Sequence, residues 1–327
     1  MSRQSELAQL GRVFDNSALS NRNLIINGSH IVNQRGLTSV TTGIGSSTFT
    51  TDRWISYGNG QAVNITIQEV ALPDGTVVNS HKTTATTSLS TVFLHPFQKV
   101  ETFGKSYLRG KTITISTWVR TNMSGQRLRI CDTVGCYTLG SEIPSDGAWH
   151  YVTGTHTMPS GMATGASDFI QIHPAFGTTN TVSGSYIEFT MTQFEVGDTA
   201  TPFEHRSYGQ ELALCQRYFQ RFNIGQYSPI GIGTKPTGTS GYMVTQLRHL
   251  HSPMRVTPTG SISSSTGTAI VLANISSGAY NATGVGVNTY SDGSWWLYGA
   301  SNLPVRESDF YEQSNTGITY YSFDAEL

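Results

Sequence analysis

The sequence is poor in charged residues and contains no long hydrophobic run. Only 13% of its 327 residues are charged, and 20 basic residues stand against 21 acidic ones, which leaves a formal net charge of -1. A nucleic-acid-binding surface or a polybasic membrane anchor needs an excess of Lys and Arg, so this balance argues against both. No apolar stretch approaches the roughly 18 residues that a membrane-spanning helix requires.

Cysteine is also scarce, and three cysteines cannot complete a disulfide framework. The opening MSRQSELAQL lacks the apolar segment of a secretory signal peptide, so we expect synthesis in a cytoplasm. Cys131 and Cys136 flank a short segment that suits a hairpin turn. Their spacing is compatible with a cross-strand disulfide formed outside a reducing compartment and equally with two packing thiols. Cys215 is expected in a core.

Hydroxyl-bearing residues and glycine are abundant. The chain has 37 Ser, 43 Thr and 34 Gly, about a third of all residues. This composition favours strands and turns over helices. With 37% hydrophobic residues, including 15 Tyr, 14 Phe and 5 Trp, the chain can still bury a substantial core. Its length suggests two such β-rich domains.

Residues 23–206 show the alternation typical of half-buried strands. Asn64–Val70 and Lys111–Val119 are the clearest examples. Further strands are predicted at Thr91–Phe97, Arg127–Cys131, Tyr137–Leu139, Trp149–Thr157, Phe169–His173 and Ser185–Phe194. Turn signals separate the strands at Pro73–Gly75, Ser124–Gly125, Asp146–Gly147 and Ser183–Gly184. Many short strands without intervening helices predict an all-β fold, a jelly-roll β-sandwich.

Short helices are predicted on both sides of this domain. In the arm 1–22, four apolar residues at three- and four-residue spacing predict an amphipathic helix for docking or oligomerisation: Leu7, Leu10, Val13 and Phe14. In the connector 207–222, one apolar face and a possible capping box of Ser207 and Gln210 predict a second helix.

Residues 223–327 return to strand patterns and predict a smaller C-terminal β domain. The clearest strands there are Tyr242–Leu250, Ala269–Ile275 and Ser294–Tyr298.

The chain lacks the common catalytic motifs. It has no nucleophile elbow, no phosphate-binding loop and no zinc-protease motif. A glycoside hydrolase would need two converging carboxylates, for which Asp168, Glu188 and Glu195 are candidates. The spacing of these residues does not show that any two converge, and ordinary surface acids are the simpler interpretation. We expect no enzymatic activity.

Binding of a sugar requires only exposed aromatic rings beside polar groups, because sugar rings stack their C–H faces on aromatic side chains. All five tryptophans are candidates for stacking, although many aromatic residues must also fill the core. Because Trp295 and Trp296 are adjacent on a predicted strand, one can be buried while the other faces outward. The candidate set is Trp54, Trp118, Trp149, Trp295 and Trp296.

Several strings, in order, resemble a family of tailed-bacteriophage virion proteins common in marine and cyanobacterial phages. They are SNRNLIING at 20–28, NQRG at 33–36, TDRW at 51–54, LRGKTITISTW at 108–118, FEVGDTATPFEHR at 194–206, CQRYFQR at 215–221, MRVTPT at 254–259 and DAEL at 324–327. The similarity covers most of the chain and is weakest at 134–181 and 261–320.

The resemblance implies a jelly roll like those of carbohydrate-binding modules and a place on the virion surface, after synthesis in the bacterial host cytoplasm. Members of the family are tail fibres, receptor-binding tips or capsid decorations. We therefore expect a homotrimer that contacts other virion proteins, with a tail fibre that attaches to host-surface polysaccharide as the preferred role. Capsid decoration and polysaccharide depolymerase are the alternatives. No cofactor is expected; a structural calcium is compatible with such modules, but no acidic cluster indicates its position.

Overall fold

A computed structural model describes residues 22–43, 47–58, 62–88, 94–177, 182–224, 229–234, 242–245, 248–264, 270–274, 278–281, 283–300, 310–314 and 319–326. The chain divides after Leu212 into two compact units, each of which is described by itself. The predicted N-terminal helix and its four apolar residues lie outside the described residues.

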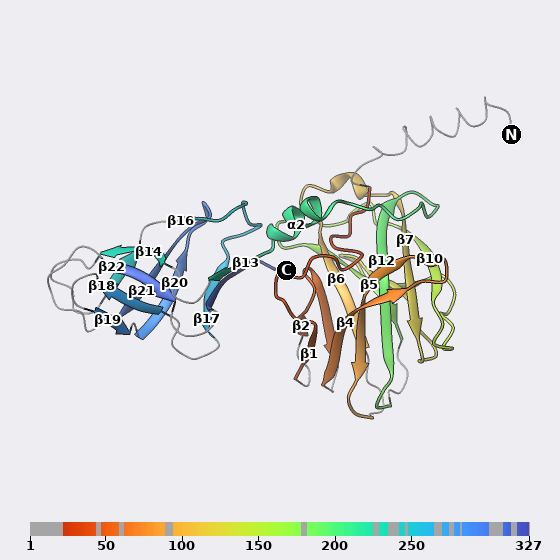
Figure 1. Cartoon of the computed structure of the whole chain (residues 1–327). Coiled ribbons are helices and arrows are strands. Elements are labelled where there is room, and N and C mark those ends of the chain that lie inside the picture. The colour runs from red at the N-terminus through yellow and green to blue at the C-terminus, as the bar shows by residue number, and fades with distance from the viewer. Residues whose placement is uncertain are drawn as a thin grey trace. The chain divides into compact units, whose positions relative to one another are not determined.

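The first unit is a sandwich of two six-stranded antiparallel sheets (Figure 1). Sheet A contains, in spatial order, β1 (Ser39–Thr41), β4 (Val63–Ala71), β5 (Val77–Ala85), β12 (Tyr186–Val196), β7 (Thr112–Thr121) and β10 (His150–Thr157). Sheet B contains β2 (Ser47–Phe49), β3 (Trp54–Gly58), β6 (Leu94–Glu101), β11 (Phe169–Phe176), β8 (Arg127–Cys131) and β9 (Cys136–Leu139). A single turn of 3-10 helix, η1 (Ser106–Leu108), follows β6.

The core of this unit forms where alternate residues of the two sheets face each other. On β7, Ile113, Ile115 and Val119 are completely buried, and they belong to one hydrophobic cluster with Ile170 and Ile172 of β11. These isoleucine and valine side chains therefore line the face of each strand that points into the sandwich.

The predicted turns are confirmed by the backbone. Gly75, Gly125, Gly147 and Gly184 all have φ between 74° and 88°. Glycine adopts this left-handed region without the steric cost that a Cβ atom imposes, which explains its place in each turn.

The predicted connector helix is correct at its start and wrong at its end. α2 spans Tyr208–Gln216, and the Ser207 backbone N–H donates to Gln210 Oε1 at 3.0 Å while the Gln210 N–H donates to Ser207 Oγ at 3.3 Å. This reciprocal pair is the predicted capping box. The residues from Phe219 onward are not helical but form β13 (Phe219–Ile224), which pairs with β23 (Thr319–Asp324). Pairing with a distant strand has overridden the helical spacing.

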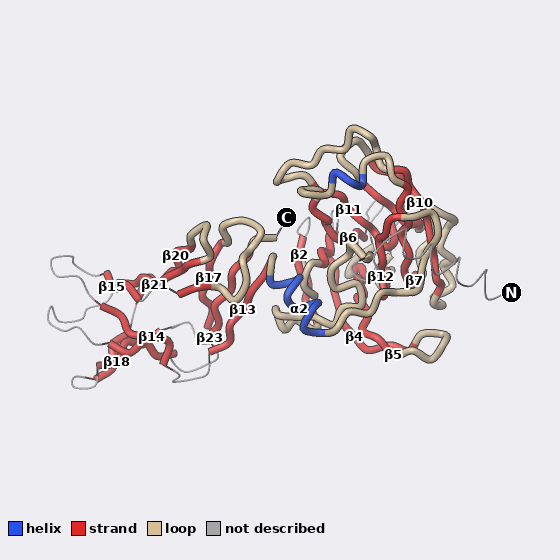
Figure 2. Tube along the Cα trace, turned by 90° about the horizontal axis from the view of Figure 1, so that it is seen from above, coloured by secondary structure: helices blue, strands red, loops and turns tan. Residues whose placement is uncertain are grey.

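The second unit is also built from strands, as Figure 2 shows in red. Its three-stranded sheet has the order β13, β23 and β17 (Thr259–Ser264). Its larger sheet has the order β16 (Arg248–His249), β21 (Ser294–Ala300), β15 (Tyr242–Thr245), β14 (Pro229–Thr234), β22 (Phe310–Ser314), β18 (Ile270–Asn274) and β19 (Gly278–Asn281), with β20 (Thr283–Thr289) also paired to β21. Of the strand predicted over Tyr242–Leu250, the described residues form β15 and β16, which both pair with β21.

The structure confirms the predicted all-β class, a β-sandwich followed by a smaller C-terminal β region. Among the described residues, no helix is long and apolar enough to span a membrane.

Candidate functional site

The first of the predicted stacking residues, Trp54, belongs to the core. Its side chain is completely buried, its ring lies 4.7 Å from that of Phe189, and its Nε1–H donates to the Asn27 carbonyl at 2.9 Å. A buried ring offers no face to a sugar, so the prediction was wrong for Trp54. The prediction was also wrong for Trp295, because its side chain is only 4% exposed.

The remaining tryptophans are half-buried. In the second unit, Trp296 donates to the Tyr290 hydroxyl at 2.9 Å, so the neighbours Trp295 and Trp296 do divide into one buried and one partly accessible ring. In the sandwich, Trp118 and Trp149 lie on the outer face of sheet A, at β7 and immediately before β10. Their role in stacking remains a prediction.

The outer face of sheet A combines these rings with fixed charges. Trp118 pairs across the strands with Tyr151, which is 46% exposed, and the ring centroids are 5.5 Å apart. The Arg120 guanidinium lies 4.8 Å from the Trp149 ring centroid and donates to Glu188 Oε2 at 2.9 and 2.8 Å. This face therefore holds a paired charge beside partly accessible rings.

The three carboxylates considered for catalysis all accept hydrogen bonds within the sandwich. Glu188 also accepts from Ser80 Oγ at 2.6 Å and Gln68 Nε2 at 2.8 Å. Glu195 accepts from the Thr201 hydroxyl and backbone, and Asp168 accepts from the Gly165 N–H. Glu188 and Glu195 are seven residues apart on β12, roughly 20 Å at 3.3 Å per residue. A glycosidase pair needs a separation of about 5–10 Å.

The outer face of sheet B also gathers aromatic rings. We call it the aromatic face and define it by Tyr57, His95, Phe97, His173 and Phe176. His95 lies 4.8 Å from Phe176 and 5.8 Å from Tyr57 between ring centroids, and Phe97 lies 5.2 Å from His173. Four of the five rings are half-buried, and only His173 is buried.

The position of Phe176 depends on an irregularity in β11. Strict alternation would direct residues 173 and 176 to opposite faces of the sheet. A register shift between His173 and Phe176 inserts the extra residue that places both on one face. The bulge thereby adds a ring to the aromatic face.

The two histidines of the aromatic face are neutral at pH 7. Burial lowers the pKa of His95 to about 4, and the nearby Arg129 guanidinium adds to the effect. Burial also holds the pKa of His173 well below its ordinary value, with further contributions from His95 and Arg129. Neutral imidazoles offer both a donor and an acceptor.

Cations lie over two phenylalanine rings of sheet B. The Arg129 guanidinium is 3.8 Å from the ring centroid of Phe176, and the Lys99 ammonium is 4.4 Å from that of Phe169. Arg129 faces His173 directly across the β8–β11 pair. Such cation–π contacts fix the orientation of the charged groups.

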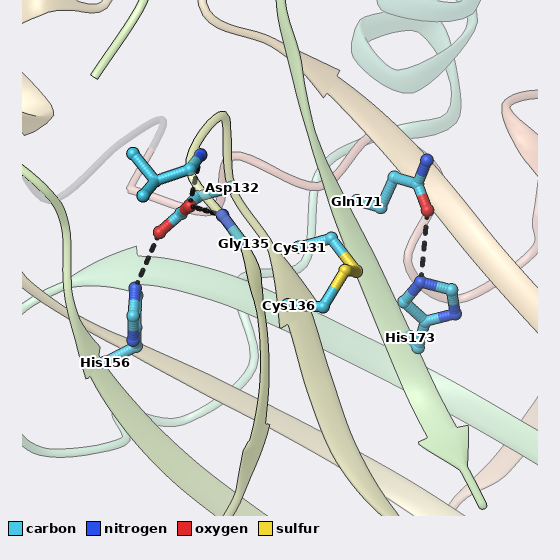
Figure 3. Close-up of a disulfide and its surroundings, with 8 residues drawn as sticks. Cys131, Asp132, Gly135, Cys136, His156, Gln171 and His173 are labelled. Atoms are coloured by element: carbon cyan, nitrogen blue, oxygen red, sulfur yellow. Dashed lines mark hydrogen bonds and ion pairs between the residues drawn. A yellow bond between two sulfur atoms is a disulfide. The ribbon is translucent and has the colours of Figure 1, made fainter. Parts of the chain in front are cut away.

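A disulfide closes the hairpin beside the aromatic face (Figure 3). Cys131 and Cys136 are bonded across β8 and β9, with Cα atoms 3.9 Å apart. Within the hairpin loop, the Asp132 carboxylate accepts from the backbone N–H of Val134 and Gly135. Asp132 also contacts His156 Nε2 of β10 at 3.0 Å, as Figure 3 shows.

No residue of the aromatic face was among the sequence candidates. His95 and Phe97 alternate on β6, and Phe169, Gln171 and His173 alternate on β11, so the period-two pattern was present in the sequence. The pattern does not show that β6, β11 and β8 are neighbours, and that adjacency is what brings the rings together. Within the described residues, no three His, Cys, Asp or Glu side chains are grouped as a metal site would require.

Comparisons with known proteins give structural similarity only. No family model matches the chain, and no curated protein matches it. Among solved structures, the CBM22-1 xylan-binding domain from Paenibacillus barcinonensis Xyn10C is 12% identical, with a TM-score of 0.31, over 49% of this chain and 95% of that domain. A family 4 carbohydrate-binding module (CBM4) is 15% identical, with a TM-score of 0.29, over 52% of this chain and 98% of that chain.

A phage protein is also among the similar structures. The enzymatically active domain of tailspike protein 4 from bacteriophage CBA120 is 15% identical, with a TM-score of 0.32, over 54% of this chain and 22% of the tailspike chain.

Proposed function

We propose that this protein is a non-enzymatic virion surface protein of a tailed phage that binds a host-surface glycan through the aromatic face of sheet B. The observation that carries the proposal is the set of half-buried rings, Tyr57, His95, Phe97 and Phe176, brought together by three neighbouring strands of one sheet, β3, β6 and β11. Aromatic rings beside imidazole and amide groups match the alternating apolar and hydroxyl surfaces of a sugar.

The place on the virion rests on the sequence strings that resemble those of tailed-phage virion proteins. Within that family we prefer a trimeric tail fibre or receptor-binding protein, attached through the arm that contains Leu7 and Phe14. The aromatic face would then meet the host surface.

Binding is tested by screening the full chain against host-surface polysaccharides and measuring affinity for those that bind. Phe97→Ala should weaken binding about 30-fold, because a central interface aromatic contributes about 2 kcal/mol. Tyr151→Ala, which removes an exposed ring from the opposite sheet, is the matched control. Unfolding temperatures of both variants establish that each is folded.

A glycan site on sheet A and one on sheet B predict different effects of these substitutions. If Tyr151→Ala or Trp118→Ala abolishes binding and Phe97→Ala does not, the site lies on sheet A and the proposed face is wrong. Release of reducing ends from a bound polysaccharide would instead identify a depolymerase and contradict the non-enzymatic proposal.

The position of the protein on the phage particle tests the proposed role as a tail fibre. Gold-labelled antibody should decorate the phage tail. Labelling spread over the head would replace the tail-fibre assignment with capsid decoration.

A further inference from the structure

Beside the aromatic face, on β8, lies a guanidinium for which the described part of the chain provides no acceptor. The Arg129 guanidinium is stacked on Phe176, and no described residue accepts a hydrogen bond from this guanidinium or forms an ion pair with it. Arg120 on the opposite sheet provides the contrast, because its Nε and Nη2 both donate to Glu188. An arginine carries five N–H donors in a planar fork, and here the stacking contact fixes the plane of that fork.

Among the residues that the structure describes, the surroundings of Arg129 do not supply a counter-charge. Burial lowers the pKa of Arg129 from its ordinary value, yet an arginine remains charged at any physiological pH. His95 and His173 are neutral for the reason given above. Placing a cation in a partly desolvated site without a partner is unfavourable, and an anionic group at the site would relieve that cost.

The other charges on the strands of this face are mainly positive. Arg127 donates to the Gly140 carbonyl at 2.9 Å, and Lys99 lies over Phe169. Among the described strand residues of the face, the only acid is Glu101, which pairs with Phe169 at the far end of β6. Strand geometry places Glu101 roughly 16 Å from Arg129, too far to neutralise it. The charge of the face is therefore complementary to an anion.

We infer that the glycan bound at the aromatic face contains an anionic sugar unit, whose carboxylate or sulfate accepts hydrogen bonds from Arg129 while its ring lies against Phe97. This inference rests on the proposed function and adds the chemical class of the ligand. A planar carboxylate can accept two parallel hydrogen bonds from the guanidinium fork, and a sulfate ester offers oxygens at a similar spacing.

The test compares charged and neutral forms of the same oligosaccharides by calorimetric titration of the full chain. One arm uses an oligogalacturonate and its methyl ester, and the other uses a sulfated galactan oligosaccharide and its desulfated form. The arm with the larger charged-to-neutral ratio identifies the anion as carboxylate or sulfate. Arg129→Gln should reduce affinity for the charged form about 10- to 100-fold, as expected for loss of hydrogen bonds to a charged group, and leave the neutral form unaffected.

Two further variants distinguish the contribution of the planar guanidinium geometry from that of the positive charge. Arg129→Lys keeps the charge without the bidentate geometry, and we expect it to recover only part of the affinity. Lys111→Gln removes an exposed cation next to β7, and we expect it to leave the preference for the charged form intact.

The outcomes distinguish this inference from the function on which it rests. Equal binding of charged and neutral forms, weakened by Phe97→Ala, would leave the glycan site in place and overturn the anionic ligand. Retention of the charged preference by Arg129→Gln would overturn it as well. Binding of neither form, or binding insensitive to Phe97→Ala, would overturn both.

Discussion

Two histidines, His30 and His81, are buried between the sheets beside Trp54 and Phe189. The His30 ring lies 5.4 Å from both His81 and Trp54, and His81 stacks on Phe189 at 5.1 Å. His81 Nε2 is 2.7 Å from Ser56 Oγ. Burial lowers the pKa of His81 to about 3 and holds that of His30 well below its ordinary value, with the proximity of His81 as the second cause.

Acid should therefore destabilise the sandwich. A folded-state pKa below the unfolded value of about 6.5 means that the unfolded chain binds the proton first as the pH falls. Stability is unaffected above pH 6.5 and is lost progressively down to about pH 3 for His81. At pH 5 the loss from His81 alone should be about 2 kcal/mol.

Urea denaturation at pH 7 and pH 5 measures this loss. His81→Gln is expected to be less stable at pH 7, because it disturbs the contact with Ser56, but its further loss between the two pH values should be smaller by about 2 kcal/mol. An equal loss in wild type and variant would show that His81 does not carry the acid sensitivity.

At the scale of the element, the β8–β9 hairpin has its own cross-link. β9 has four residues and forms the end of sheet B, so it pairs with only one strand. The Cys131–Cys136 disulfide limits the freedom of this segment in the unfolded chain. For so short a loop the chain-entropy relation gives about 2 kcal/mol.

The double variant Cys131→Ser/Cys136→Ser should accordingly unfold with a free energy lower by about 2 kcal/mol than the oxidised protein. Hydrogen exchange should increase first in β9, and reductant should have no effect on the double variant. Equal stability of the oxidised and serine proteins would show that strand pairing alone fixes the hairpin.

Elements were predicted from the sequence more successfully than the relations between them. The alternation in Asn64–Val70 and the glycine turns indicate local geometry, and β4 and the four turns follow. Alternation does not encode which strands become neighbours. The burial of Trp54 and the contact between Phe97 and His173 could therefore not be predicted from the sequence. The bulge before Phe176 likewise reverses the face that a simple period of two assigns to it.

At the scale of the whole molecule, the two units have separate cores. The hydrophobic cluster of the sandwich consists of residues between Ile25 and Phe194, whereas Trp295 packs against Tyr321 and Phe323 at ring distances of 5.4 and 5.0 Å. We therefore expect a core substitution in one unit to destabilise that unit alone.

Calorimetry of Trp295→Ala tests this independence. Replacing a buried tryptophan by alanine costs about 3–5 kcal/mol, so the transition of the second unit should move to lower temperature while that of the sandwich stays in place. Glycan binding should be unchanged, because Trp295 offers no accessible ring. One common transition that moves as a whole would show that the two units unfold together.

The strand order of the sandwich determines which strands lie at the sheet edges, and these edges are where neighbouring copies of the protein could associate. An outermost strand exposes backbone groups that can recruit another chain, and short outermost strands limit this hazard. β1 and β2 have three residues each and β9 has four, whereas β10 has eight. Of the four sheet margins among the described residues of the sandwich, that formed by β10 is the longest. If two closely spaced sandwiches associated through backbone hydrogen bonds between strands, we would therefore expect the contact to form at β10.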